Sequence, residues 1–105
     1  MTITPQMLDE AARRFALLGD PTRLRILHVV MEEGERSVSA IADAAETSRF
    51  NASAHLNRLA TAGLVSRRRE GNSVLYRIAD ENLPGICDAM CASLRAQARE
   101  LLARS

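Results

Sequence analysis

Aromatic residues are almost absent from this sequence, which has two Phe, one Tyr and no Trp among 105 residues. The hydrophobic content is nevertheless 47%, so we expect a folded chain whose core consists of aliphatic side chains and methionine. This length allows one domain with a modest core, but not two. We therefore treat residues 1–105 as a single domain.

Long apolar runs and export signals are missing as well. No run reaches the roughly eighteen apolar residues that a membrane-spanning helix needs, so we expect no membrane partner. The first residues, MTITPQMLDEAARR, lack the order of a charged and then an apolar segment that marks a signal peptide. Without that signal, the two cysteines favour free thiols in a reducing cytoplasm over a disulfide.

Net charge is small, at +1, but it is unevenly distributed. Residues 47–78 contain six arginines and one acid, a balance of +5, whereas the rest of the chain holds eight arginines and twelve acids. All basic residues are arginine, which suits bidentate contacts with phosphate and guanine. Such polarity makes one face of the molecule positive, as expected for a protein that binds a polyanion.

The few prolines and glycines mark the expected ends of helices. Thr4-Pro5 and Asp20-Pro21 each have the pattern of an N-cap followed by proline at the first helical position. The apolar stripes that follow recur every three or four residues, and they end at Gly19 and Gly34. We therefore expect one helix over about 5–18 and a second that begins at Pro21.

A helix-turn-helix pattern follows these two helices. Ser37 or Ser39 can cap a short third helix, and a polar turn at about 45–48 leads into a fourth helix over about 48–60. Glycine then ends the fourth helix at Gly63. In the fourth helix, the residues expected to face inward are Ala52, Leu56, Leu59 and Ala60.

The next segment changes to the pattern of a β-hairpin. Two extended stretches flank Glu70-Gly71-Asn72-Ser73, which predicts a hairpin over about 64–78. A last helix over about 82–103 follows, with Pro84 in its first turn. The predicted fold class is therefore mainly α with a small β-hairpin wing, in the order ααααββα.

The predicted helix over 48–60 carries short polar and cationic side chains opposite its apolar stripe. Such a helix fits the major groove of DNA, where Asn and Arg recognise adenine and guanine edges. The hairpin arginines would then lie along backbone phosphates or in the minor groove. The candidate DNA-binding residues are Ser48, Arg49, Asn51, Ser53, Ala54, Asn57 and Arg58 on the helix, and Arg67, Arg68, Arg69 and Arg77 on the hairpin.

Alternatives to this interpretation stay open. The arginines could form a solvated hairpin with no ligand, or the winged helix could bind another protein. Phe50 either touches a sugar or methyl group or packs into the turn, and we favour packing. For an enzyme, a cysteine would have to pair with His28 or His55, but no acid, oxyanion turn or glycine-rich loop accompanies them. We therefore predict no enzymatic activity.

Three segments resemble the ArsR/SmtB-type winged helix-turn-helix repressors: LGDPTRLRIL (18–27), SVSAIADAAETSRFNASAHLNRLATAGLVSRRREG (37–71) and VLYRIAD (74–80). The resemblance covers almost the whole chain. It implies a homodimer held by the first and last helices, bound to an inverted-repeat operator and released by a metal, metalloid, oxidant or sulfur species. Arg49-Phe50-Asn51 stands where this family often has small polar residues, so the operator sequence stays open.

The effector sites usual in this family have no match here. Ser37 and Ser39 replace its Cys-x-Cys box. Of the family's Asp/His set on the last helix, Asp80 remains, while the other places are taken by Asn82, Ser93 and Ala96. The resemblance therefore implies no zinc or nickel site of the usual kind.

Cys87 and Cys91 remain as candidates for sensing an effector. They are four residues apart and hence on one helix face. Thiolates suit metalloids, soft metals and oxidants. In the alternative, both cysteines are small hydrophobic residues of the dimer core. The protein is then constitutive or responds to an organic ligand.

Overall fold

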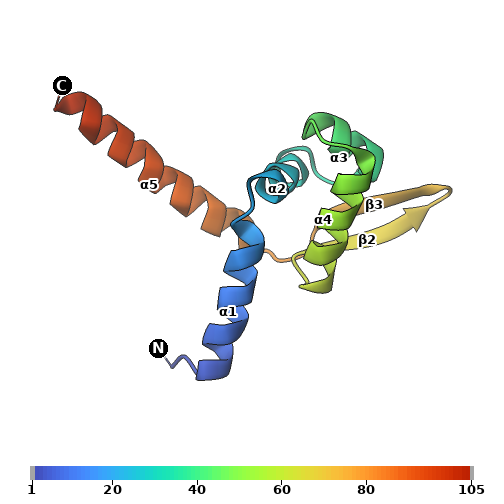
Figure 1. Ribbon diagram of the computed structural model, residues 1–105, viewed down its shortest axis with the longest axis horizontal. Coiled ribbons are helices and arrows are strands. Elements are labelled where there is room, and N and C mark those ends of the chain that lie inside the picture. The colour runs from blue at the N-terminus through green and yellow to red at the C-terminus, as the bar shows by residue number, and fades with distance from the viewer. Residues whose placement is uncertain (1, 105) are drawn as a thin grey trace.

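The computed structural model describes residues 2–104 and confirms the predicted fold class (Figure 1). It is mainly helical, with a small antiparallel sheet that carries the wing. The elements in chain order are α1 (Pro5–Leu18), α2 (Pro21–Glu33), β1 (Arg36–Ser37), α3 (Val38–Ala44), α4 (Arg49–Thr61), β2 (Val65–Glu70), β3 (Ser73–Ile78) and α5 (Leu83–Ala103).

The sheet contains a strand that the sequence did not predict. Arg36 pairs with Tyr76 and Ser37 with Leu75, so that β1 lies on the free side of β3 and the strand order is β1-β3-β2. A strand of two residues is too short to show an alternating pattern, which explains why it was missed. This third strand anchors the wing to the corner that follows α2.

Local side-chain caps explain why the helices begin where they do. The Thr4, Ser37 and Ser48 hydroxyls each accept a hydrogen bond from the backbone N–H three residues later, at 3.0–3.2 Å. Asp20 caps α2 in the same way, at 2.8 Å from the N–H of Arg23. Ser37 is therefore the cap of α3, and Ser39 is not.

Two turns contain a residue with left-handed backbone: the hairpin turn between β2 and β3 and the turn between α3 and α4. Gly71 has φ 60° at the first position of the two-residue hairpin turn, where glycine adopts this conformation without steric cost. Glu46 has φ 56° in the turn between α3 and α4. A side chain with a Cβ is disfavoured there, so this turn stores some backbone strain.

The core lies between α2, α3, α4 and the sheet. As predicted, the buried residues that the structure describes are almost all aliphatic, and they include Ile26, Leu27, Ile41, Leu56 and Leu59. Methionine, which was also expected in the core, is only partly buried there, at Met31. Tyr76 on β3 is the one aromatic residue of this cluster, and only 1% of it is exposed. This packing fixes the wing and α4 on one rigid body.

The first and last helices contribute little to that core. None of the residues of α1 is buried, and in α5 only Leu83 is. Figure 1 shows α5 projecting away from the rest of the molecule. The whole structure, with α5 included, measures 54 × 39 × 20 Å. Within residues 2–104, none of the helices combines the length and apolarity that crossing a membrane requires.

Candidate nucleic-acid interface

The outer face of α4 carries the polar side chains expected from the sequence. Ala52, Leu56 and Leu59 are fully buried against the core. Ser53 is half-buried on the edge of the helix. The remaining candidates of this helix are exposed: Ser48, Arg49, Asn51, Ala54, Asn57 and Arg58. Burial of this stripe therefore turns the candidate residues other than Ser53 toward solvent.

Phe50 does not pack into the turn, so the expectation for this residue was wrong. It is 82% exposed. The reason is helical geometry: Phe50 precedes the buried Ala52 by two residues, which places the two about 200° apart around the helix axis. An aromatic ring thus stands free at the start of α4, beside Arg49 and Asn51.

Asn57 joins α4 to the wing. Its Oδ1 accepts one hydrogen bond from the Tyr76 hydroxyl at 2.8 Å and another from Arg67 Nη1 at 3.1 Å. A guanidinium can only donate, so the oxygen of the Asn57 amide must face these two partners. The amide NH₂ group is therefore the part of Asn57 that remains for another acceptor.

A cleft of about 300 Å³ lies between α3, α4 and the wing. Arg49 and Arg67 both line it, and so do Ser37, Ser39 and Ser53. None of the lining residues is acidic. Hydroxyl groups and two cations without a carboxylate make this cleft suitable for an anionic ligand.

The wing arginines lie on two different faces of the sheet. Paired residues of antiparallel strands share a face, so Arg67 (opposite Tyr76) and Arg69 (opposite Val74) lie on the face that packs against α4. Arg68 (opposite Leu75) and Arg77 (opposite Ser66) lie on the other face. The sequence assigned all four to DNA, but their surroundings differ.

Arg68 forms ion pairs with two carboxylates, those of Glu35 and Glu70. Its Nε lies 3.1 and 3.0 Å from the two oxygens of Glu35, and its Nη2 lies 2.7 Å from Glu35 and 2.9 Å from Glu70. These hydrogen bonds from Arg68 lower the pKa of Glu35, with smaller contributions from the charges of Arg68 and Arg77. The same contacts raise the pKa of Arg68.

A buried arginine supports α4 from behind. Arg23 is only 7% exposed, and its Nε donates to His55 Nδ1 at 3.3 Å while its Nη1 donates to the carbonyl of Leu17 at 3.0 Å. It thereby joins α1, α2 and α4. Sequence reasoning missed this role, because Arg23 and His55 are 32 positions apart and no local pattern relates them.

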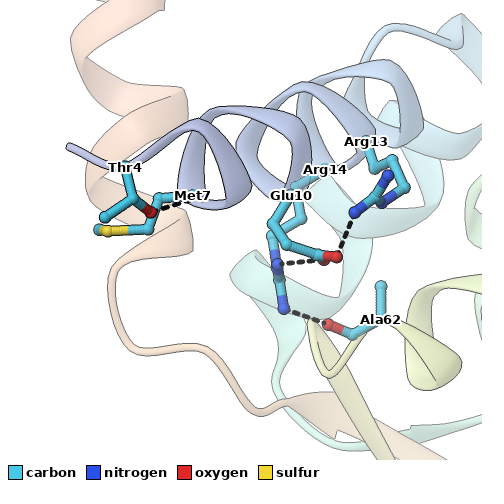
Figure 2. Close-up of polar contacts among 6 residues, drawn as sticks. All are labelled: Thr4, Met7, Glu10, Arg13, Arg14 and Ala62. Carbon is cyan, nitrogen blue, oxygen red and sulfur yellow. Dashed lines mark hydrogen bonds and ion pairs between the residues drawn. The ribbon is translucent and has the colours of Figure 1, made fainter.

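A second contact connects α1 with the end of α4. Figure 2 shows Arg14 reaching the carbonyl oxygen of Ala62, at 3.2 Å, with Glu10 bridging Arg14 and Arg13. The hydrogen bond from Arg13 lowers the pKa of Glu10. Because Ala62 is the C-cap of α4, Arg14 places a positive charge at the negative end of the helix dipole.

The two cysteines lie on α5 beside a second, apolar cavity of about 650 Å³. Cys87 is half-buried and Cys91 is exposed, and neither forms a disulfide. Burial raises the pKa of the Cys87 thiol, and the neighbouring Cys91 and Asp88 raise it further. Among the residues that the structure describes, no group of three or more His, Cys, Asp or Glu is placed to hold a metal ion.

Comparison with known proteins finds helix-turn-helix relatives of this chain. Residues 18–68 match a family model described as a helix-turn-helix domain. An uncharacterized HTH-type transcriptional regulator, MJ1325, from Methanocaldococcus jannaschii is 40% identical over 78 residues, covering 74% of this chain and 88% of that protein. Several other curated relatives are longer, and the chain spans 34% to 61% of their length.

Solved structures share both the fold and part of the sequence. One is the homodimeric winged helix-turn-helix DNA-binding domain of Mb0332 from Mycobacterium bovis, a possible ArsR-family transcriptional regulator. It is 38% identical with a TM-score of 0.71, and the match covers 95% of this chain and 88% of that one. Another is the AntR antimony-specific transcriptional repressor, 30% identical with a TM-score of 0.80, covering 93% and 89%.

Proposed function

Because the chain belongs to the ArsR/SmtB family of winged helix-turn-helix transcriptional regulators, we propose that it is a dimeric repressor that binds an inverted-repeat DNA operator. One observation carries the proposal. Arg49, Arg58, Arg67 and Arg69 surround the exposed polar face of α4, and no carboxylate of residues 2–104 lies within ion-pair distance of any of them.

The proposed role of α4 is to enter the major groove. Arg49, Asn51 and Arg58 have the donors that distinguish guanine and adenine, and Ala54 leaves room for a thymine methyl. Ser48 and Ser53 suit a phosphate, and the free N–H groups at the start of α4 add to that site. Phe50 is exposed in the same place, so its ring would contact a sugar or a methyl group.

The proposed dimer uses the two end helices, which leave much of their apolar surface exposed. Exposed apolar side chains occur along α1, at Met7, Leu8 and Phe15, and along α5, at Ile86, Met90, Leu94 and Leu102. Apolar surfaces of this extent normally mark an interaction site. A second copy pairing through both helices would place two α4 helices at sites one turn of DNA apart, about 34 Å.

The experiment that tests DNA binding is a salt titration. The purified protein is titrated by fluorescence anisotropy against DNA from upstream of its own gene, at several salt concentrations. Each phosphate contact contributes a slope of about −0.9 in log affinity against log salt. Two dimer-related pairs of Arg67 and Arg69 alone therefore predict a slope steeper than about −3. No binding to DNA, even at low salt, would instead favour a protein-interaction module.

The same salt titration can test one arginine at a time, with a matched control variant. Arg67→Ala removes one cation from the proposed interface, whereas Arg104→Ala removes one from the far end of α5, where it pairs with Glu100 at 2.6 Å. We expect weaker binding and a shallower slope with the first variant and neither change with the second. Equal effects would mean that net charge, and not the surface around α4, determines affinity.

For release from DNA, we propose a thiol-reactive effector at Cys87 and Cys91. The two residues are one helical turn apart and border the apolar cavity, so one trivalent arsenic bearing an organic group could replace its two hydroxyls by two sulfurs, with loss of two waters. The antimony-specific AntR is consistent with such an effector. Two thiols per chain match an arsenical that binds two sulfurs better than they match a tetrahedral metal site, which needs four ligands.

The effector proposal is tested with reduced protein bound to its operator. A trivalent monosubstituted arsenical should release the parent protein, and Cys87→Ser and Cys91→Ser should remain bound. The thiolate is the reactive form, and the pKa of Cys87 is raised, so the rate of reaction should still be increasing with pH above neutral. Unchanged DNA binding by the treated parent would return both cysteines to a packing role, in a regulator without a thiol sensor.

A further inference from the structure

The charges on the two faces of the wing differ in a way that sequence alone does not reveal. On the face that packs against α4, Arg67 and Arg69 have no carboxylate neighbour among the described residues. On the opposite face, Glu35 and Glu70 accompany Arg68 and Arg77, and the charges cancel. Four arginines that look equivalent in the sequence therefore form one cationic face and one neutral face.

The contact between Arg68 and Glu35 spans the sheet. Arg68 lies on β2 opposite Leu75 of β3, and Leu75 is in turn opposite Ser37 of β1. Glu35 lies in the corner between α2 and β1, so the ion pair joins strands on both sides of β3. Both oxygens of Glu35 accept from the guanidinium, and the Glu35 side chain is only 27% exposed. Bidentate pairs of this kind hold one geometry.

We propose that Arg68 does not contact DNA and acts instead with Glu35 as a positioning pair that sets the angle of the wing. The wing contacts with phosphate then fall to Arg67 and Arg69. To reach a phosphate, Arg68 would have to leave two carboxylates, which would remain unpaired beside the DNA backbone. The Arg67–Asn57–Tyr76 contacts fix the opposite face of the wing, so the hairpin is held from both sides.

This inference rests on the proposed DNA-binding function, and the salt dependence of binding separates the two. For Arg68→Ala we expect affinity to fall about three- to tenfold because the wing is less well placed, with an unchanged salt slope. For Arg67→Ala the slope should become shallower by about 0.9 per protomer. A slope that decreases equally in both variants would make Arg68 a phosphate contact and overturn the proposal.

Substitutions at Glu35 provide the sharpest contrast. If Glu35 only repelled DNA, Glu35→Gln would tighten binding, whereas a positioning role predicts weaker binding. The matched control is Glu33→Gln, which removes the same charge nearby but breaks only a 3.9 Å contact with Arg36, three residues away. Tighter binding by both variants would overturn the proposal. Weaker binding by Glu35→Gln alone would support it.

Exchanging the two charges completes the test. Glu35→Arg and Arg68→Glu should each weaken DNA binding, and the double variant should recover most of the loss because the pair is restored in reverse. A phosphate contact could not be rescued in this way, since position 68 would carry a negative charge toward DNA. If the double variant does not recover DNA binding, although its circular dichroism and thermal unfolding are native, the positioning role is wrong. If the parent protein itself binds no DNA, the proposed function fails first.

Discussion

The middle of the chain and its two end helices differ in how far their apolar side chains are buried. From α2 to β3, the apolar stripes meet one another, and Ile26, Leu27, Ile41 and Leu59 are completely buried. Along α5, by contrast, Met90 is 64% exposed and Leu94 is 58% exposed. Both regions are amphipathic in sequence, but only the first finds its partner within the same chain.

This difference separates two tasks. The middle region packs α4 and the wing, the proposed DNA-reading unit, against one core within this chain. In the proposed dimer the exposed apolar surface of the end helices becomes buried, so their contribution to stability would depend on protein concentration. An effector acting on α5 could therefore alter the placement of two reading units while leaving each one intact.

The largest expected effect is a loss of stability from a cavity in the middle region. Leu56→Ala removes a fully buried side chain from α4, which should lower the free energy of unfolding by about 2–5 kcal/mol. Urea denaturation measures this loss. Arg58→Ala on the exposed face of the same helix is the control, with an expected change of less than about 0.5 kcal/mol. A similar loss in both variants would mean that α4 is not packed as described.

The next largest effect should be on dimerisation, with no change in the fold of each chain. Leu94→Glu places a charge on the apolar stripe of α5, which should raise the dimer dissociation constant by at least about tenfold, since burying the leucine contributes about 1.5–3 kcal/mol. Analytical ultracentrifugation measures the change. Ala96→Glu is the matched control, because residue 96 lies about 200° from residue 94 around the helix. Identical dissociation of both variants would exclude the stripe as the interface.

The helices could be predicted from the sequence because the signals that begin them are local. Thr4-Pro5, Asp20-Pro21 and Thr47-Ser48 marked the starts of helices, and the caps at Thr4, Asp20 and Ser48 act over only three residues. The inward-facing residues of α4 followed from a 3.6-residue period. The last helix was predicted over about 82–103, and a resemblance to known proteins implied its proposed role in pairing.

The contacts that the sequence did not predict join distant residues. Arg68 and Glu35 are 33 positions apart, and Arg23 and His55 are 32 apart, so no periodicity relates them. Alternation along β2 could have separated Arg67 from Arg68, but it could not show which face carries carboxylates. Strand β1 was too short to recognise. The outward direction of Phe50 was available from helical geometry, and a general preference for burying aromatic rings outweighed it.

The smallest expected effect concerns the contact that crosses between the two regions. Arg14 on α1 donates to the carbonyl of Ala62 at the end of α4, so Arg14→Met removes a charge from that helix terminus while retaining much of the side-chain volume. Because the site is exposed, we expect a loss of only about 0.3–1 kcal/mol in the free energy of unfolding. Arg13→Met is the control, since Arg13 contacts Glu10 on its own helix. If Arg14 couples the dimer helices to the reading helix, Arg14→Met should also weaken operator binding more than Arg13→Met does. Equal operator affinities would mean that the contact between Arg14 and Ala62 does not couple the two regions.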